Sequence, residues 1–209
     1  MSDALALRDV AVRRGGRTIL EGVDLVAPPG LVLLTGSNGS GKSTLMLAIA
    51  GIVPLVRGAI AIDGHDLVAH GVAAKRQLGF LPERNDALEH LVARQWLAAV
   101  AGLRRTAVPD VHELLDDTVL DRPIGALSSG QRRKLALAVA CCGEPRVLLL
   151  DEPTNALDTD GLAALDRIIA RWRDAGRTIV CALHRPERFE HTPDVRWHVD
   201  AGKVTAQSR

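Results

Sequence analysis

The stretch LVLLTGSNGSGKS (residues 31–43) decides the fold of this chain. Its first part, LVLLT (31–35), is short, apolar and β-prone, which is typical of a strand buried on both faces of a parallel sheet. The glycine-rich segment GSNGSGKS (36–43) follows directly and matches the pattern G-x-x-x-x-G-K-[ST], which joins a strand to a helix. The stretch therefore predicts an α/β fold with a parallel sheet.

The residue types of this loop suit the binding of a phosphate chain. Its glycines let the backbone curl so that successive N–H groups point inward, and the helix that begins near Lys42 adds the positive end of its dipole. We expect Lys42 to reach the β- and γ-phosphates and Ser43 to bind Mg²⁺. An ordinary glycine turn is the alternative, but here strand, lysine and hydroxyl coincide. The predicted phosphate-binding residues are Gly36, Ser37, Asn38, Gly39, Ser40, Gly41, Lys42, Ser43 and Thr44.

Apolar runs later in the chain repeat the α/β pattern. RVLLL (146–150) and RTIVCAL (177–183) predict further buried strands. The helix expected between them, GLAALDRIIARWR, has apolar residues at helical spacing, which predicts a core-facing stripe of Leu162, Leu165, Ile168 and Trp172.

Shorter β-prone runs precede the glycine-rich loop. VAVRR, the turn GG and TILEGVDLVA predict a small antiparallel unit, which RGAIAIDG (57–64) extends. The segment from about Arg84 to Arg122 is rich in alanine, leucine and charge, and it predicts a helical insertion. We therefore expect one domain over residues 1–209, with a parallel core, an N-terminal antiparallel β subdomain and a helical subdomain inserted at about 84–130.

Composition limits the classes of partner that this chain is expected to bind. The chain has 209 residues, with 26 basic and 25 acidic ones and a net charge of +1, so charge gives no reason to expect a nucleic-acid partner. The cysteines Cys141, Cys142 and Cys181 lie in apolar runs without metal-ligand spacing, which predicts small core residues of a reduced, cytosolic protein. No apolar run approaches about 18 residues, so we expect no membrane span within the chain.

Two acids follow the strand predicted at 146–150. An acid at the carboxyl end of a buried strand lies where α/β sheets bind ligands, so we expect Asp151 to hold Mg²⁺ through a water or hydroxyl. Glu152 could orient or deprotonate an attacking water. Taken alone, such acids are often a helix cap or a solvated turn. His184 ends the next buried strand, and this position distinguishes it from the other histidines, although a lone histidine is more often structural.

The motif that begins a second predicted helix contains no acidic or basic residue. In LSSGQ (127–131), Ser128 or Ser129 can cap the following helix QRRKLALAVA, and Gly130 permits a close approach, so the motif predicts a second anion-binding helix start. The basic run Arg132, Arg133 and Lys134 is interpreted as a solvated helix face rather than a nucleic-acid patch.

The order of these motifs, phosphate loop, LSSGQ, LLLDEP, ALD (156–158) and histidine, resembles the ATP-binding subunit of ATP-binding cassette (ABC) transporters in a short, export-type form. The resemblance implies a P-loop NTPase core that binds ATP and Mg²⁺. It also implies that two subunits pair head to tail and that part of each ATP site comes from the partner. Glu152 would be the general base and His184 the γ-phosphate contact. The residues implied to serve ATP in trans are Ser128, Ser129, Gly130, Gln131 and Asp158.

Three positions depart from the family pattern. Glu83, in LGFLPE, aligns with the usual glutamine at Mg²⁺, and its carboxylate is also a hard oxygen ligand. Arg14 stands near the usual adenine-stacking aromatic, and its guanidinium either stacks on the base or is solvated, which predicts weak discrimination between ATP and GTP. Ser129 stands where glycine is usual and adds a hydroxyl at the expected dimer interface.

The resemblance implies an ATPase subunit that powers a membrane transporter, with export as the expected direction. Its partners would be a second ABC subunit and a separate polytopic membrane protein, which would hold the chain at the cytoplasmic face of the cell membrane. A soluble ABC-type ATPase acting in assembly, as in iron–sulfur assembly, is the alternative. A metabolite kinase is a poorer third reading, because it leaves LSSGQ and ALD without a purpose.

Overall fold

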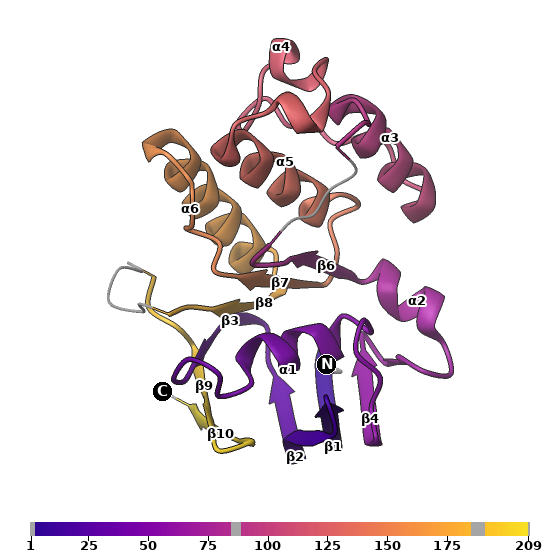
Figure 1. Cartoon of the computed structure of the whole chain (residues 1–209), viewed down its shortest axis with the longest axis vertical. Helices are drawn as coiled ribbons and strands as arrows, with labels where there is room; N and C mark the ends of the chain where they lie inside the picture. The colour runs from indigo at the N-terminus through magenta and orange to yellow at the C-terminus, as the bar shows by residue number, and fades with distance from the viewer. Residues whose placement is uncertain (1–2, 85–88, 185–190, 209) are drawn as a thin grey trace.

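The computed structural model describes residues 3–84, 89–184 and 191–208. In these residues, one sheet has the strand order β10-β9-β3-β8-β7-β6 (Figure 1). Its strands are β3 (Gly30–Thr35), β6 (Leu78–Leu81), β7 (Val147–Asp151), β8 (Thr178–Ala182), β9 (Val195–Asp200) and β10 (Lys203–Ser208). β3 pairs in parallel with β8 and β9, and β7 pairs in parallel with β6 and β8. The predicted parallel sheet is therefore confirmed.

A second sheet contains the N-terminal strands in the order β2-β1-β4-β5. They are β1 (Leu5–Arg14), β2 (Arg17–Ala27), β4 (Arg57–Ile62) and β5 (His65–Asp66). β1 pairs antiparallel with β2 on one side and with β4 on the other, so the segment at 57–64 extends the N-terminal hairpin as predicted.

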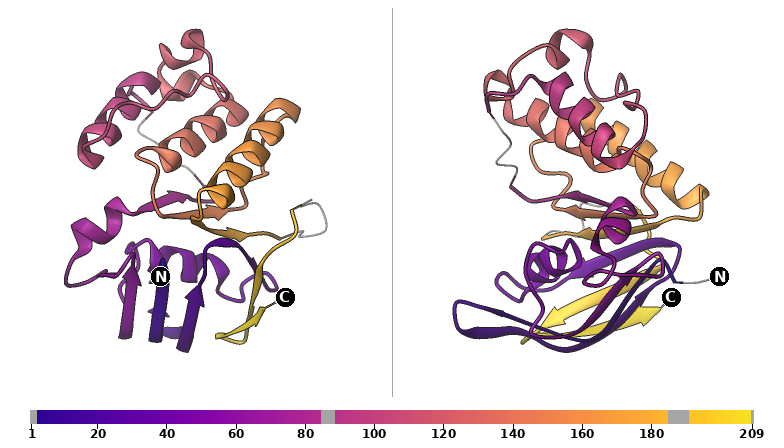
Figure 2. Two further views of the ribbon diagram at one scale, coloured as in Figure 1. Left: turned by 180° about the vertical axis from the view of Figure 1, so that it is seen from behind. Right: turned by 90° about the vertical axis from the view of Figure 1, so that its right-hand side faces the viewer.

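Helices lie on both sides of the parallel strands. They are α1 (Lys42–Ile49), α2 (Gly71–Arg76), α3 (Ala93–Arg104), α4 (Asp117–Leu120), α5 (Ser129–Cys141) and α6 (Thr159–Asp174), with a 3-10 turn η1 (Ile124–Ala126). Figures 1 and 2 show α3 to α6 on one side of β6, β7 and β8, and α1 with the antiparallel sheet on the other. In the segment predicted to be a helical insertion, residues 105–116 form turns and loops between α3 and α4.

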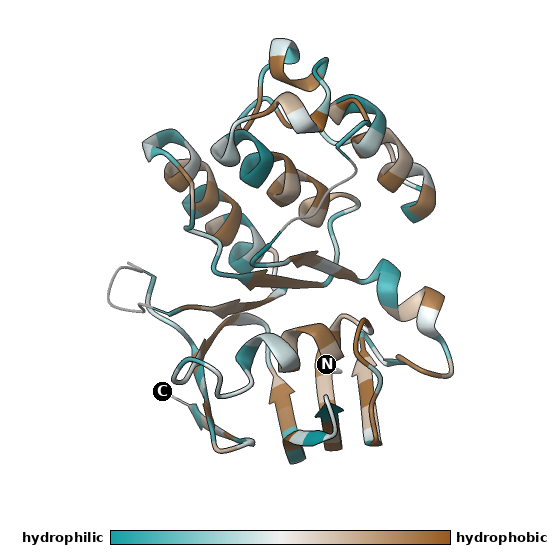
Figure 3. Cartoon of the chain, viewed as in Figure 1, coloured by the Kyte–Doolittle hydropathy of each residue, from teal (hydrophilic) through white to brown (hydrophobic). Residues whose placement is uncertain are grey.

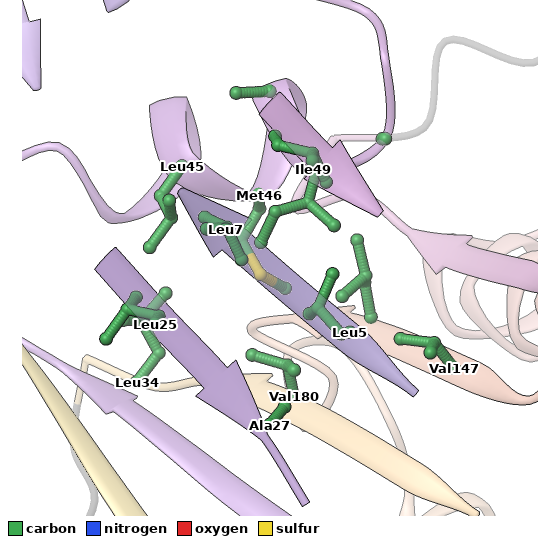
Figure 4. Close-up of a cluster of buried hydrophobic side chains, with 14 of the residues drawn as sticks. Leu5, Leu7, Leu25, Ala27, Leu34, Leu45, Met46, Ile49, Val147 and Val180 are labelled. Atoms are coloured by element: carbon green, nitrogen blue, oxygen red, sulfur yellow. The ribbon is translucent and has the colours of Figure 1, made fainter. Parts of the chain in front are cut away.

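The core consists of two apolar clusters, separated by the parallel sheet. Val32 and Leu34 of β3 pack with α1 and the antiparallel sheet, and Figure 4 shows Leu34 in this cluster. Leu31 and Leu33 of the same strand pack with α5 and α6 on the opposite face. Because successive side chains of a strand alternate between faces, burial on both faces explains the uninterrupted apolar run. The same uninterrupted apolar character appears in Figure 3 as hydrophobic colour along β7 and β8.

Some elements differ from the predictions. β6, β9 and β10 were not predicted, because a four-residue apolar run and two alternating strands near the chain end are weak signals. Leu162 is 37% exposed although Leu165, Ile168 and Trp172 are buried, so the predicted apolar stripe of α6 begins one turn later. Cys142 and Cys181 are buried, as expected of core residues. Within the described ranges, every helix is too short or too polar to cross a membrane.

Candidate nucleotide-binding site

A pocket of about 920 Å³ lies beyond the carboxyl ends of β3, β7 and β8. This is the edge at which open α/β sheets bind ligands, because the loops that follow neighbouring parallel strands converge there. The predicted residues that line it are Arg14, Asn38, Gly39, Gly41, Lys42, Ser43, Thr44, Glu83, Asp151, Glu152 and His184. The fold therefore brings together residues from distant parts of the sequence.

The phosphate loop connects β3 to α1. Gly36 has φ 148°, and a Cβ atom there would lie 2.4 Å from the carbonyl oxygen of Val199 in β9, so this position requires glycine. The Lys42 ammonium donates hydrogen bonds to the carbonyls of Gly36 (2.6 Å) and Ser37 (3.1 Å), which keeps the lysine over the loop. Gly36, Ser37 and Ser40 belong to the loop but lie outside the pocket lining.

Oxygen atoms suited to Mg²⁺ meet at one side of the pocket. The Ser43 hydroxyl hydrogen-bonds to the carboxyl group of Asp151, whose residue is only 4% exposed. Burial raises the pKa of Asp151, and the nearby Glu83 carboxylate raises it further. Two close carboxylates and a hydroxyl fit a hard divalent cation that takes its other ligands from water and phosphate. A bound Mg²⁺ would offset the negative charge of these carboxylates and of a phosphate chain.

Glu152 occupies an unusual backbone conformation beside this group. Its φ is 50°, in the left-handed region, and its N–H donates to the carbonyl of Ala182 at 2.9 Å. The backbone N–H of His184 donates to the Glu152 carboxylate, so the two predicted catalytic residues are neighbours. Burial, and then the charge of Asp151, raise the pKa of Glu152, which suits a general base.

The basic run after LSSGQ is not a solvated face. Arg133 is 5% exposed, so the earlier interpretation is wrong for this residue. Arg132 donates to the Leu127 carbonyl, and the Lys134 ammonium lies 2.8 Å from the Asp158 carboxylate. The period of 3.6 residues turns Arg133 toward the sheet, where backbone carbonyls accept hydrogen bonds from both terminal nitrogens of its guanidinium.

The LSSGQ residues form the first turn of α5. The Ser128 hydroxyl accepts from the N–H of Gln131 (3.2 Å), and the Gln131 side chain accepts from the N–H of Ser128 (3.0 Å). Of the two serines, Ser128 is therefore the cap. A Cβ atom on Gly130 would lie 2.9 Å from the carbonyl of Ala156, so glycine allows α5 to approach the loop before α6 closely.

The residues predicted to act in trans do not line the pocket of their own chain. Ser128, Ser129, Gly130, Gln131 and Asp158 are absent from its lining. Asp158 instead caps α6, where its carboxylate accepts from the N–H of Gly161 at 2.8 Å.

Other lining residues were missed by the sequence analysis. Ile19 lies on β2 close after Arg14, and Leu162 had been assigned to the core. Thr154 and Asn155 follow the two predicted acids after Pro153, and this proximity is a signal that could have found them. The missed residues are Ile19, Thr154, Asn155, Ala156, Leu162 and Leu183.

Comparisons with known proteins identify the family of this chain. Residues 20–155 match the family model described as "ABC transporter". The lantibiotic transport ATP-binding protein SrtF of Streptococcus pyogenes is 30% identical over 205 residues, which cover 96% of this chain and 88% of that protein.

Two solved structures are also similar. One, the "Structure of ATP binding subunit of ABC transporter", has a TM-score of 0.88 at 25% identity, and the match covers 98% of this chain and 90% of the other. The dimeric structure of MJ0796, a bacterial ABC transporter cassette, has a TM-score of 0.84 at 20% identity over 98% of each chain. This second likeness concerns the fold alone.

Proposed function

The chain belongs to the ABC transporter family and is an ATPase of that family, and we propose that it powers a membrane transporter through ATP-driven pairing with a second ABC subunit. The single observation that carries this proposal is the division of the motifs. The phosphate loop, both acids and His184 line one pocket, whereas the LSSGQ residues and Asp158 lie outside it. A second subunit, paired head to tail, would supply those residues to the open side of the pocket.

The chemistry follows from the lining residues. Lys42 and the loop N–H groups bind the phosphate chain. Ser43, Asp151 and Glu83 would hold Mg²⁺, which would offset the charge of that chain. Glu152 takes a proton from the attacking water, which then adds to the γ-phosphorus as the bond to the β-phosphate oxygen breaks. His184 donates to the γ-phosphate and stabilises the charge that develops there.

The proposed partner is a separate polytopic membrane protein. The helices of the ATPase would transmit motion to it. The similarity to an ATP-binding protein of lantibiotic transport supports a transport role. Export is the proposed direction, because this chain is similar to some export-type subunits at the position of the acidic residue Glu83. The chain would then be held at the cytoplasmic face of the membrane by that partner.

The decisive variant is Glu152→Gln. It removes the proton acceptor but keeps the shape of the side chain, so ATP should still bind while hydrolysis falls by a factor of about 10² to 10⁴. Measurements of ATP affinity and of phosphate release under saturating ATP and Mg²⁺ separate the two effects.

Glu144→Gln is the matched control, because Glu144 is also a glutamate with a left-handed backbone (φ 48°) and its carboxylate pairs with Arg177 on the surface. We expect it to hydrolyse ATP like the wild type. Full hydrolysis by Glu152→Gln would exclude Glu152 as the base.

A pull-down tests the transport partner. Tagged Glu152→Gln with ATP, taken through detergent-solubilised membranes of the source cell, should retain a polytopic membrane protein in near-stoichiometric amount. Recovery of soluble proteins alone, from a preparation that retains another membrane complex, would favour the assembly ATPase instead.

A further inference from the structure

Arg133 joins three segments that the proposed mechanism treats as separate. It belongs to α5, directly after the LSSGQ motif, yet its guanidinium lies among the loops that follow β6 and β7. One nitrogen donates to the carbonyls of Pro82 and Glu83, and the other donates to those of Asp151 (2.6 Å) and Glu152 (2.7 Å). A single side chain thus connects the helix start to both loops that carry the acidic residues.

The bonds to Asp151 and Glu152 depend on the backbone of Glu152. In an extended strand, successive carbonyls point to opposite sides, so a single donor cannot reach both. The left-handed conformation of Glu152 (φ 50°) turns the two carbonyls toward the same guanidinium nitrogen. This conformation is costly for a residue with a side chain, because its Cβ atom crowds the following carbonyl oxygen. The bonds from Arg133 favour it and thereby orient the Glu152 side chain.

The positive charge of Arg133 suits the acidic surroundings of its guanidinium. Burial lowers its pKa and the charges of Asp151, Glu152 and Glu83 raise it, but an arginine stays protonated in either case. Its planar fork spans two loops, whereas a lysine ammonium at the end of a flexible stem cannot reproduce both arms.

We propose that Arg133 is a positioning residue, which holds the loops of Glu83, Asp151 and Glu152 in register with α5 and so sets the rate of hydrolysis. The inference rests on the proposed role of Glu152 as the base. Arg133 lies outside the pocket lining and acts through the residues that it holds.

Arg104 offers a matched control in the same chain. Its guanidinium also bridges two segments through backbone carbonyls, those of Cys142 (2.8 Å) and Leu78 (2.7 Å). It joins the end of α5 to the beginning of β6, whereas Arg133 joins the start of α5 to the loop after β6. Loss of either bridge should lower stability. Only the loss of Arg133 should displace the loops that carry Glu83, Asp151 and Glu152.

The experiment compares Arg133→Lys with Arg104→Lys in the full chain. For R133K we expect kcat to fall about 10- to 100-fold, as for a displaced reacting group, with the Kd for ATP within about two-fold of the wild type. For R104K we expect both constants within about two-fold of the wild type, with a comparable fall in Tm. Equal kcat values for the two variants, or a loss of hydrolysis by R133K that saturating ATP restores, would overturn the proposal.

Two further proteins keep the test decisive. If R133K does not fold, R133Q takes its place under the same comparison, because glutamine also donates to a carbonyl but lacks the fork. Glu152→Gln is assayed alongside. Wild-type hydrolysis by Glu152→Gln refutes the proposed base itself, whereas an inactive Glu152→Gln beside a fully active R133K refutes the role of Arg133 alone.

Discussion

At the residue scale, the environment of Glu152 adjusts its chemistry. Burial and the neighbouring Asp151 make its charged form less favourable, and the His184 N–H partly offsets this. A carboxylate in water is a weak base, whereas one whose pKa lies nearer to the working pH takes a proton more readily. The charge of Glu83 acts in the same direction as Asp151, so a residue that departs from the family pattern affects the proposed base.

The raised pKa of Glu152 predicts an acid limb in the pH profile. The base works when it is deprotonated, so kcat/KM, which reports the free enzyme, should fall as pH falls through its pKa, with a midpoint above the ordinary value of 4.5. Glu83→Gln should move that midpoint down, because it removes a negative charge that raises the pKa. Phosphate release at ATP concentrations well below KM, from about pH 4 to pH 8, gives kcat/KM and measures both midpoints. A wild-type midpoint at or below 4.5 would contradict the proposed environment.

At the element scale, three residues at the start of α5 make three different contacts. Ser128 caps the helix, Arg133 faces the sheet and Lys134 pairs with Asp158 at the start of α6. The N-terminal turn is therefore held by hydrogen bonds and an ion pair, while the middle of the helix packs through Leu135 and Leu137 in the core.

Removal of the cap should loosen this turn. Ser128→Ala leaves the N–H of Gln131 without its acceptor and should lower the free energy of unfolding by about 1 kcal/mol. Ser129→Ala is the control, because Ser129 is exposed and Ser128 makes the capping bonds, so its effect should stay within about 0.5 kcal/mol. Urea unfolding without nucleotide compares them. Equal losses for the two variants would show that the capping box contributes little.

At the scale of the whole molecule, the fold separates two sets of residues that both suit ATP. The pocket set lies at the carboxyl edge of the parallel sheet, and the LSSGQ turn lies at the start of α5. If two chains pair head to tail, the phosphate loop and the LSSGQ turn of one chain would serve different nucleotides.

Dimer formation tests this separation. In the Glu152→Gln background with ATP and Mg²⁺, we expect a dimer in sedimentation experiments, whereas the added substitution Ser129→Arg should keep the chain monomeric. A large charged side chain at the proposed interface is costly to bury. Ser129→Ala in the same background is the control and should still form dimers. Retained ATP affinity in the monomeric variant would show that the phosphate loop is intact, and ATP-driven dimers of Ser129→Arg would refute the in-trans role.

The sequence analysis was most successful where local pattern dictates structure. The apolar runs at 31–35 and 146–150 are strands of the parallel sheet, because residues buried on both faces leave a continuous signal. It was least successful where burial depends on neighbours. Arg133 and Leu162 have ordinary helical spacing, and no local pattern shows that the first is buried or that the second lines the pocket.

The sequence by itself determined the family, the parallel α/β core and the identity of the acidic, basic and glycine residues of the motifs, because these depend on residue type and spacing along the chain. Tertiary structure alone decided that Ile19 and Leu162 line the same pocket as the phosphate loop, and that Arg133 holds the backbone of Glu152. The physical reason is that such contacts join segments far apart in the chain, and they form only when the strands align and both apolar clusters are buried.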